Sequence, residues 1–210
     1  VEYAWGGKVG MAFDRMPRIP DEVAYLFQAK SFALGHLYVP APPEPMAAAL
    51  SYDWIAIADG KWFSIFPPGW PAALAIGVAL GLPFIVNPLI AALTLPVGHA
   101  LVSRWVSPRL AVLVTLLLAV SPWYLATGAS LMSHSLTLLL VLSAWLLMLT
   151  QGPRRPLAWL AAGCLMGWLF LTRPISGGLL FASVASVAFA LWQHRRQQRK
   201  LQQADGDVDF

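Results

Sequence analysis

Two adjacent carboxylates, Asp21 and Glu22, are the residues of this chain best suited to acid–base chemistry. They are its only neighbouring acidic residues, and no Asp or Glu occurs between Gly60 and Ala204. A reaction that needs a base therefore has few other carboxylates to use. The alternative is that both side chains only stabilise the start of a helix, where the helix dipole favours negative charge.

Arg173 is the most informative cation, because it separates two long apolar runs, 156–172 and 174–193. A charge between apolar segments is costly and usually functional. A guanidinium offers paired donors to phosphate oxygens, so a lipid phosphate would suit it. The alternative is that Arg173 only ends a helix at the level of the lipid headgroups.

Two further residues could bind a phosphate or a sugar hydroxyl. Lys61 lies in an aromatic and proline-rich stretch, 59–71, and His134 lies in a turn with serine and threonine, 127–135. Each also has a plainer interpretation. The lysine could simply extend to the headgroups beside aromatic anchors, and the histidine could be a satisfied polar residue.

The composition indicates an integral membrane protein. Of the 210 residues, 58% are hydrophobic and 11% are charged, against about 25% charged in a soluble domain. The net charge of +4 comes from cations that cluster at the ends of apolar runs, which indicates membrane topology rather than nucleic-acid binding. The single cysteine, Cys164, excludes an internal disulfide. No His, Cys and acidic residues have the spacing of zinc ligands, so we expect no metal site and no cofactor, with a divalent cation left open.

The long apolar runs predict an all-α fold, a polytopic transmembrane helical bundle over residues 84–193. A crossing needs about 20 residues, so the runs provide about five crossings, two of them in the longest run. The four runs are 84–103, 110–152, 156–172 and 174–193. The longest must then turn near 127–135.

The parts outside the bundle are an external loop, 1–83, and a solvated cytoplasmic tail, 194–210. In the loop, apolar spacing from Asp21 to Leu37 predicts a short amphipathic helix. Residues 71–82 are too short to cross and should lie in the interface as a juxtamembrane helix. Because Val1 is not an initiator Met and no spanning helix follows it, we expect an upstream helix to be missing.

The basic residues allow a test of this topology. The clusters at 104–109, 154–155 and 195–200 are separated by two crossings each, so all three fall on the cytoplasmic side. The outer side then receives every candidate site residue: Asp21, Glu22, Lys61, His134 and Arg173. A carboxylate near phosphate-binding cations at the bilayer surface suits transfer of a group from a lipid phosphate to a hydroxyl.

Several motifs, in this order, resemble a known family. Together they are similar to the N-terminal half of bacterial GT-C membrane glycosyltransferases of the family 39 type, which are related to protein O-mannosyltransferases and lipid A aminoarabinose transferases. The motifs are the stretches 19–30, 60–63, 67–71, 87–89, 121–122, 130–134 and 171–174.

This resemblance implies an inverting enzyme of the bacterial cytoplasmic (inner) membrane whose active site faces outside. It would take a sugar from a polyprenyl phosphate and pass it to a lipid, protein or glycan acceptor. Asp21 would be the base, with Glu22 assisting or orienting. Lys61, His134 and Arg173 would bind the donor phosphate or sugar. Relatives have a helix before the acidic loop and continue beyond the position of Phe210, so the resemblance also implies a truncated chain.

Two other functions stay open. A membrane transporter or flippase component could use Arg173 for an anionic substrate, and the proline and glycine breaks in the helices suit broken transporter helices. Against this, the ionisable residues lie at helix ends and the halves show no repeat. The chain could also be an inactive fragment, and the expectation of a missing upstream helix favours this alternative.

Overall fold

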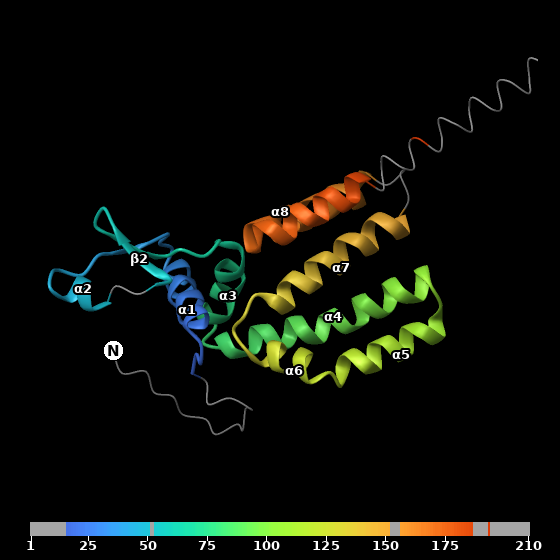
Figure 1. Ribbon diagram of the computed structural model, residues 1–210, viewed down its shortest axis with the longest axis horizontal. Helices are drawn as coiled ribbons and strands as arrows, with labels where there is room; N and C mark the ends of the chain where they lie inside the picture. The colour runs from blue at the N-terminus through green and yellow to red at the C-terminus, as the bar shows by residue number, and fades with distance from the viewer. Residues whose placement is uncertain (1–15, 51–52, 152–155, 187–192, 194–210) are drawn as a thin grey trace, which may run out of the picture.

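The computed structural model describes residues 16–50, 53–151, 156–186 and 193. In Figure 1, the helices and small sheet of residues 16–79 gather at one end, and the longer helices extend from there. We call residues 16–79 the head. The predicted tail, 194–210, and the first ten residues lie outside the described residues.

A helix is confirmed at the predicted place as α1, Pro20–Ala33, but it is not the expected apolar face that is buried. Val23 is exposed, and the buried residues are both polar and apolar: Glu22, Ala24, Tyr25, Gln28, Ala29 and Ser31. The helix begins with Pro20 in its first turn, and that turn also contains the two carboxylates. It ends before position 37 because Gly35 adopts a φ of +78°, which is typical of a helix terminus. One face of α1 is buried against α3, Gly69–Ala79.

A small antiparallel sheet, which the sequence analysis did not predict, completes the head. Its strands are β1 (Val39–Pro40), β2 (Ile55–Ala58) and β3 (Lys61–Ser64), in the order β1-β3-β2. Asp59 and Gly60 both have positive φ, which is the two-residue hairpin turn that an Asp-Gly pair favours. The short helix α2, Met46–Leu50, lies in the same part of the chain.

Gln28 of α1 joins the sheet to the helix. Its Oε1 accepts from the Ser64 amide at 2.8 Å, and its Nε2 donates to the Leu37 carbonyl at 2.7 Å. An aromatic contact strengthens the same junction, because the Phe27 and Trp62 rings lie 4.7 Å apart. The sheet is therefore held against the C-terminal half of α1.

The apolar runs form helices that pack side by side in the order α5, α4, α7, α8. Large exposed apolar side chains on α4 and α5, such as Leu93 and Leu117, are typical of a lipid-facing surface. The helices are α4 (Pro83–Trp105), α5 (Pro108–Ala119), α6 (Pro122–Ala129), α7 (His134–Gln151), α8 (Pro156–Thr172) and Pro174–Ser186.

The helix lengths only partly bear out the predicted bundle. Within the described residues, α4 is long and apolar enough to cross a membrane, and α5 with α6 passes the same test as a pair bent by 60°. The extra break follows from Ser121 and Pro122, since the Ser121 hydroxyl caps the new helix and proline opens it. Helices α7, α8 and Pro174–Ser186 are apolar but shorter. A mostly helical fold is thus confirmed, and about five crossings stay a prediction.

Candidate active site

The two carboxylates of α1 have different surroundings. Glu22 is 5% exposed, and both of its oxygens bind backbone amides: Oε2 accepts from Arg18 at 2.7 Å and Oε1 from Leu131 at 2.9 Å. Asp21 is partly exposed and has no hydrogen bond or ion pair within the described part of the chain. Asp21 is therefore the carboxylate that could accept a proton from a substrate, whereas Glu22 fixes the backbone.

Arg173 reaches the turn before α7 from the end of α8. Its Nε donates to the Ser133 hydroxyl at 2.9 Å, and its Nη2 lies 3.2 Å from Nε2 of His134. A guanidinium can only donate, so His134 accepts through Nε2 and carries its proton on Nδ1. Two of the predicted phosphate ligands, Arg173 and His134, are thus brought together.

Tyr25 brings α1 to the same cluster. Its side chain is 6% exposed, and this burial raises the pKa of the phenol, while hydrogen bonding to Ser133 and the charge of Arg173 lower it and the charge of Asp21 raises it. Asp21 also acts electrostatically on His134. The carboxylate, the phenol, the imidazole and the guanidinium therefore face one small region, which we call the Arg173 cluster: Asp21, Tyr25, Ser133, His134 and Arg173.

Sequence reasoning missed Tyr25 and Ser133. A weak signal existed for both, because Tyr25 follows Asp21 by one helical turn and Ser133 directly precedes His134. Neither spacing is specific enough to select a tyrosine or a serine from the sequence alone.

Lys61 is not brought to this cluster by its described contacts. It lies on β3 and is exposed, and its Nζ sits 5.0 Å from the centre of the Tyr38 ring, a cation–π contact. The opposite end of β3, at Ser64, is the end that binds α1. A role for Lys61 at the donor phosphate stays a prediction.

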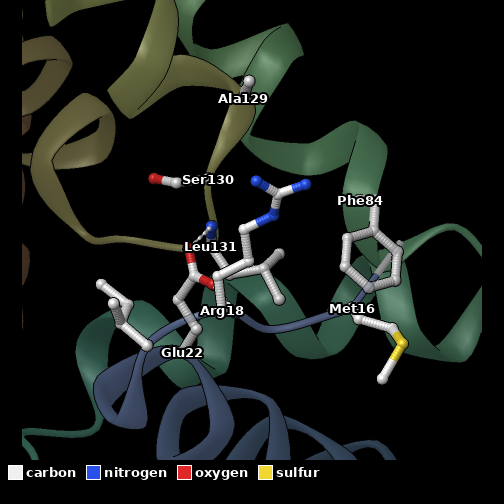
Figure 2. A pocket seen from close by; sticks show the side chains of 8 residues that line it. Met16, Arg18, Glu22, Phe84, Ala129, Ser130 and Leu131 are labelled. Atoms are coloured by element: carbon white, nitrogen blue, oxygen red, sulfur yellow. Dashed lines mark hydrogen bonds between the residues drawn. The ribbon is translucent and has the colours of Figure 1, made fainter. Parts of the chain in front are cut away.

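A small cavity of about 170 Å³ lies beside Glu22 and Leu131, which both line it. In Figure 2, Glu22 reaches toward Leu131 with the Arg18 side chain beside them, and Met16 and Phe84 lie together away from Glu22. Ligand pockets usually reach about 300 Å³ or more, so this space is small for a complete substrate. Within the described residues, no three His, Cys, Asp or Glu side chains are grouped for a metal ion.

The arrangement defines a class of protein, a mostly helical protein with an acidic and cationic cluster at one end of its apolar helices. A family model described as "Dolichyl-phosphate-mannose-protein mannosyltransferase" matches residues 67–204. The chain belongs to this family and is a membrane glycosyltransferase of the GT-C type. The predicted resemblance is thereby confirmed.

The matched range has a clear relation to the cluster. It includes Ser133, His134 and Arg173 and begins after Asp21 and Tyr25. Searches of curated proteins and of solved structures gave no match. Helix α1 lies outside the matched range, so its connection to the site comes from its contacts with the matched part of the chain.

Proposed function

We propose that the protein transfers a sugar from a polyprenyl phosphate to a hydroxyl acceptor, with inversion, at the outer face of the bacterial cytoplasmic membrane. The observation that carries the proposal is the Arg173 cluster, in which Asp21, a carboxylate without a hydrogen-bond or ion-pair partner in the described chain, and the Arg173 guanidinium both act on Tyr25 and His134. The matched family supplies the reaction class, because its description is that of a mannosyltransferase that uses a lipid phosphate sugar.

In the proposed reaction, Asp21 removes the proton from the acceptor hydroxyl as that oxygen attacks C1 of the sugar. The new oxygen–C1 bond forms while the bond between C1 and the phosphate oxygen breaks. The electron pair of the broken bond leaves with the polyprenyl phosphate. Attack from the side opposite the phosphate inverts C1, and the proton stays on the Asp21 carboxylate until solvent removes it.

Arg173 would stabilise the departing phosphate. The phosphate gains negative charge as it leaves as a monoester, so its attraction to the guanidinium increases during the reaction. Arg173 therefore stabilises the transition state more than the bound donor. His134 and Ser133 hold the guanidinium through Nη2 and Nε. Because His134 carries its proton on Nδ1, its Nε2 lone pair can accept a hydrogen bond from Arg173.

An outer active site agrees with the distribution of charge. The basic clusters at 104–109 and 195–200 belong to the opposite ends of the apolar runs. The Arg173 cluster lies where α7 begins and α8 ends, and it contains the acidic first turn of α1. This arrangement would let a donor whose chain stays in the lipid present its phosphate at the headgroup level.

The proposal is tested by transfer of radiolabelled sugar from a panel of polyprenyl-phosphate sugars, using membranes that contain the complete protein. We expect transfer by the wild type and a loss of about 100-fold or more in Asp21→Asn. Asp59→Asn is the matched control, because Asp59 is exposed in the hairpin turn and asparagine also tolerates positive φ there. Unchanged transfer by Asp21→Asn would exclude this carboxylate as the base.

A further inference from the structure

We infer that Trp70 and Asn87, together with Glu22, are positioning residues for the Arg173 cluster. They hold the backbone of residues 130–132, and this backbone leads directly into Ser133 and His134, the two side chains that contact Arg173. The inference rests on the proposed function, because it assigns these residues a role in placing the guanidinium for the donor phosphate.

The peptide groups of Leu131 are held from both directions. The amide N–H donates to Oε1 of Glu22 at 2.9 Å, and the carbonyl accepts from Nε1 of Trp70 at 2.7 Å. Trp70 is 0% exposed and Leu131 is 2% exposed, so water does not compete for these bonds. Two helices of the head, α1 through Glu22 and α3 through Trp70, thereby fix the position of Leu131.

Asn87 holds the carbonyls around the same turn from α4. Its Nδ2 lies 3.0 Å from the Thr127 carbonyl, 2.6 Å from that of Ser130 and 3.0 Å from that of Met132. The side chain is 0% exposed, and an amide nitrogen has two hydrogens to share among these three acceptors. Asn87 therefore joins the end of α6 to the turn that precedes α7.

The consequence for the site follows from chain connectivity. Ser133 and His134 are the next residues after this clamped segment, and each makes one polar contact with Arg173. A shift of the turn by about 1 Å would lengthen these contacts beyond hydrogen-bonding range. Misplacement of that size at a reacting centre can cost about 100-fold in rate.

A comparable bond elsewhere on α4 provides a control. Thr94 is 0% exposed and donates through Oγ1 to the Ile90 carbonyl at 2.8 Å. This bond, like those of Asn87, joins a buried side chain of α4 to a backbone carbonyl, and it does not touch residues 130–134.

The kinetic test compares Trp70→Phe with Thr94→Val, each alone and combined with Arg173→Ala, in the transfer assay. We expect Trp70→Phe to lower kcat/KM for the donor by about tenfold in the wild-type background. In the Arg173→Ala background it should cost less than about twofold, because the guanidinium that Trp70 helps to place is gone. Thr94→Val should have the same small effect in both backgrounds. Equal losses from Trp70→Phe in both backgrounds would overturn the inference.

A second measurement is independent of activity. Hydrogen–deuterium exchange of the purified protein reports the amide of Leu131, which Glu22 holds. We expect faster exchange in the 129–134 segment for Glu22→Gln, Trp70→Phe and Asn87→Leu, and unchanged exchange there for Thr94→Val. If the wild type transfers no sugar, the proposed function fails, and this exchange pattern still decides whether the clamp exists. Uniform acceleration across all four variants would mean general destabilisation and would contradict the clamp.

Discussion

The Nε atom of Arg173 donates a hydrogen bond of 2.9 Å to the hydroxyl of Ser133, a residue 40 positions earlier in the chain. This bond joins the end of α8 to the start of α7, where His134 makes the second contact with the guanidinium. Both contacts leave further guanidinium N–H groups available to a ligand, since the side chain has five donors. The relationship makes Arg173 a fixed cation at a helix end.

Replacing Arg173 tests whether the guanidinium geometry matters beyond its charge. In Arg173→Lys the charge remains, but the paired donors and the bond to Ser133 are lost. We expect kcat/KM for the polyprenyl-phosphate donor to fall by about 10- to 100-fold, as for loss of a charged hydrogen bond. Arg104→Lys is the matched control, because Arg104 is exposed in the last turn of α4. Donor saturation curves for both variants supply the measurement, and equal curves would remove Arg173 from the donor site.

His134 supplies a hydrogen-bond acceptor to Arg173, so the effect of replacing it should depend on whether the new side chain can also accept a hydrogen bond. His134→Gln can still present a side-chain oxygen to the guanidinium, whereas His134→Leu cannot. We expect the leucine variant to lose about tenfold in kcat/KM and the glutamine variant to keep most of the activity. His99→Leu provides the control, because His99 contacts Thr115 between α4 and α5, outside the cluster. Equal losses in the two His134 variants would contradict the acceptor role.

The sequence predicted the parts of this site that depend on local signals. The helix α1 and its two carboxylates follow from apolar spacing and from Pro20, and the end of α8 follows from Pro174. The partner of Glu22 was not predictable in this way, because Leu131 lies 109 positions away and contributes only a backbone amide. A backbone partner leaves no mark on residue type, so sequence spacing cannot identify it.

The small sheet shows a second limit of sequence reasoning. The Asp59–Gly60 pair is a strong hairpin signal between β2 and β3. The aromatic residues of β3, such as Trp62, are equally typical of a membrane interface, so residue type does not distinguish a strand from an interfacial segment here. The strand β1 has two residues and pairs with β3 through Val39 and Pro40, which is too short for a period-two pattern. Tertiary contact with Gln28 therefore decided the structure here.

Tyr25 should make stability depend on alkaline pH. Burial raises the pKa of its phenol above the ordinary value of 10.0, so the folded protein holds this proton more tightly than the unfolded chain does. The resulting stabilisation is complete below pH 10.0 and is lost as pH rises through the raised pKa. We expect the unfolding temperature to fall less between about pH 9 and about pH 11 in Tyr25→Phe than in the wild type.

The control for this pH effect is Tyr38→Phe, since Tyr38 is 45% exposed. Its unfolding temperature should follow the wild-type pH profile. The Tyr25→Phe variant also removes a hydroxyl from the Arg173 cluster, so its transfer activity should be measured at neutral pH. A wild-type pH profile for Tyr25→Phe would show that the phenol is not held in its neutral form by burial.

Gly69 should be required for the approach of α3 to α8, and this approach bears directly on Arg173. A Cβ at Gly69 would lie 2.7 Å from backbone atoms of both Leu171 and Thr172, the residues just before the arginine. Gly69→Ala must therefore separate the two helices, and we expect a loss of about 1–3 kcal/mol in the free energy of unfolding, as for overpacking. Gly167→Ala on α8 is the matched control, because a Cβ there has no neighbour within 4 Å, and alanine favours a helix over glycine. Unfolding temperature and transfer activity should both fall in Gly69→Ala while Gly167→Ala keeps both, and equal behaviour of the two variants would mean that the α3–α8 contact does not position the site.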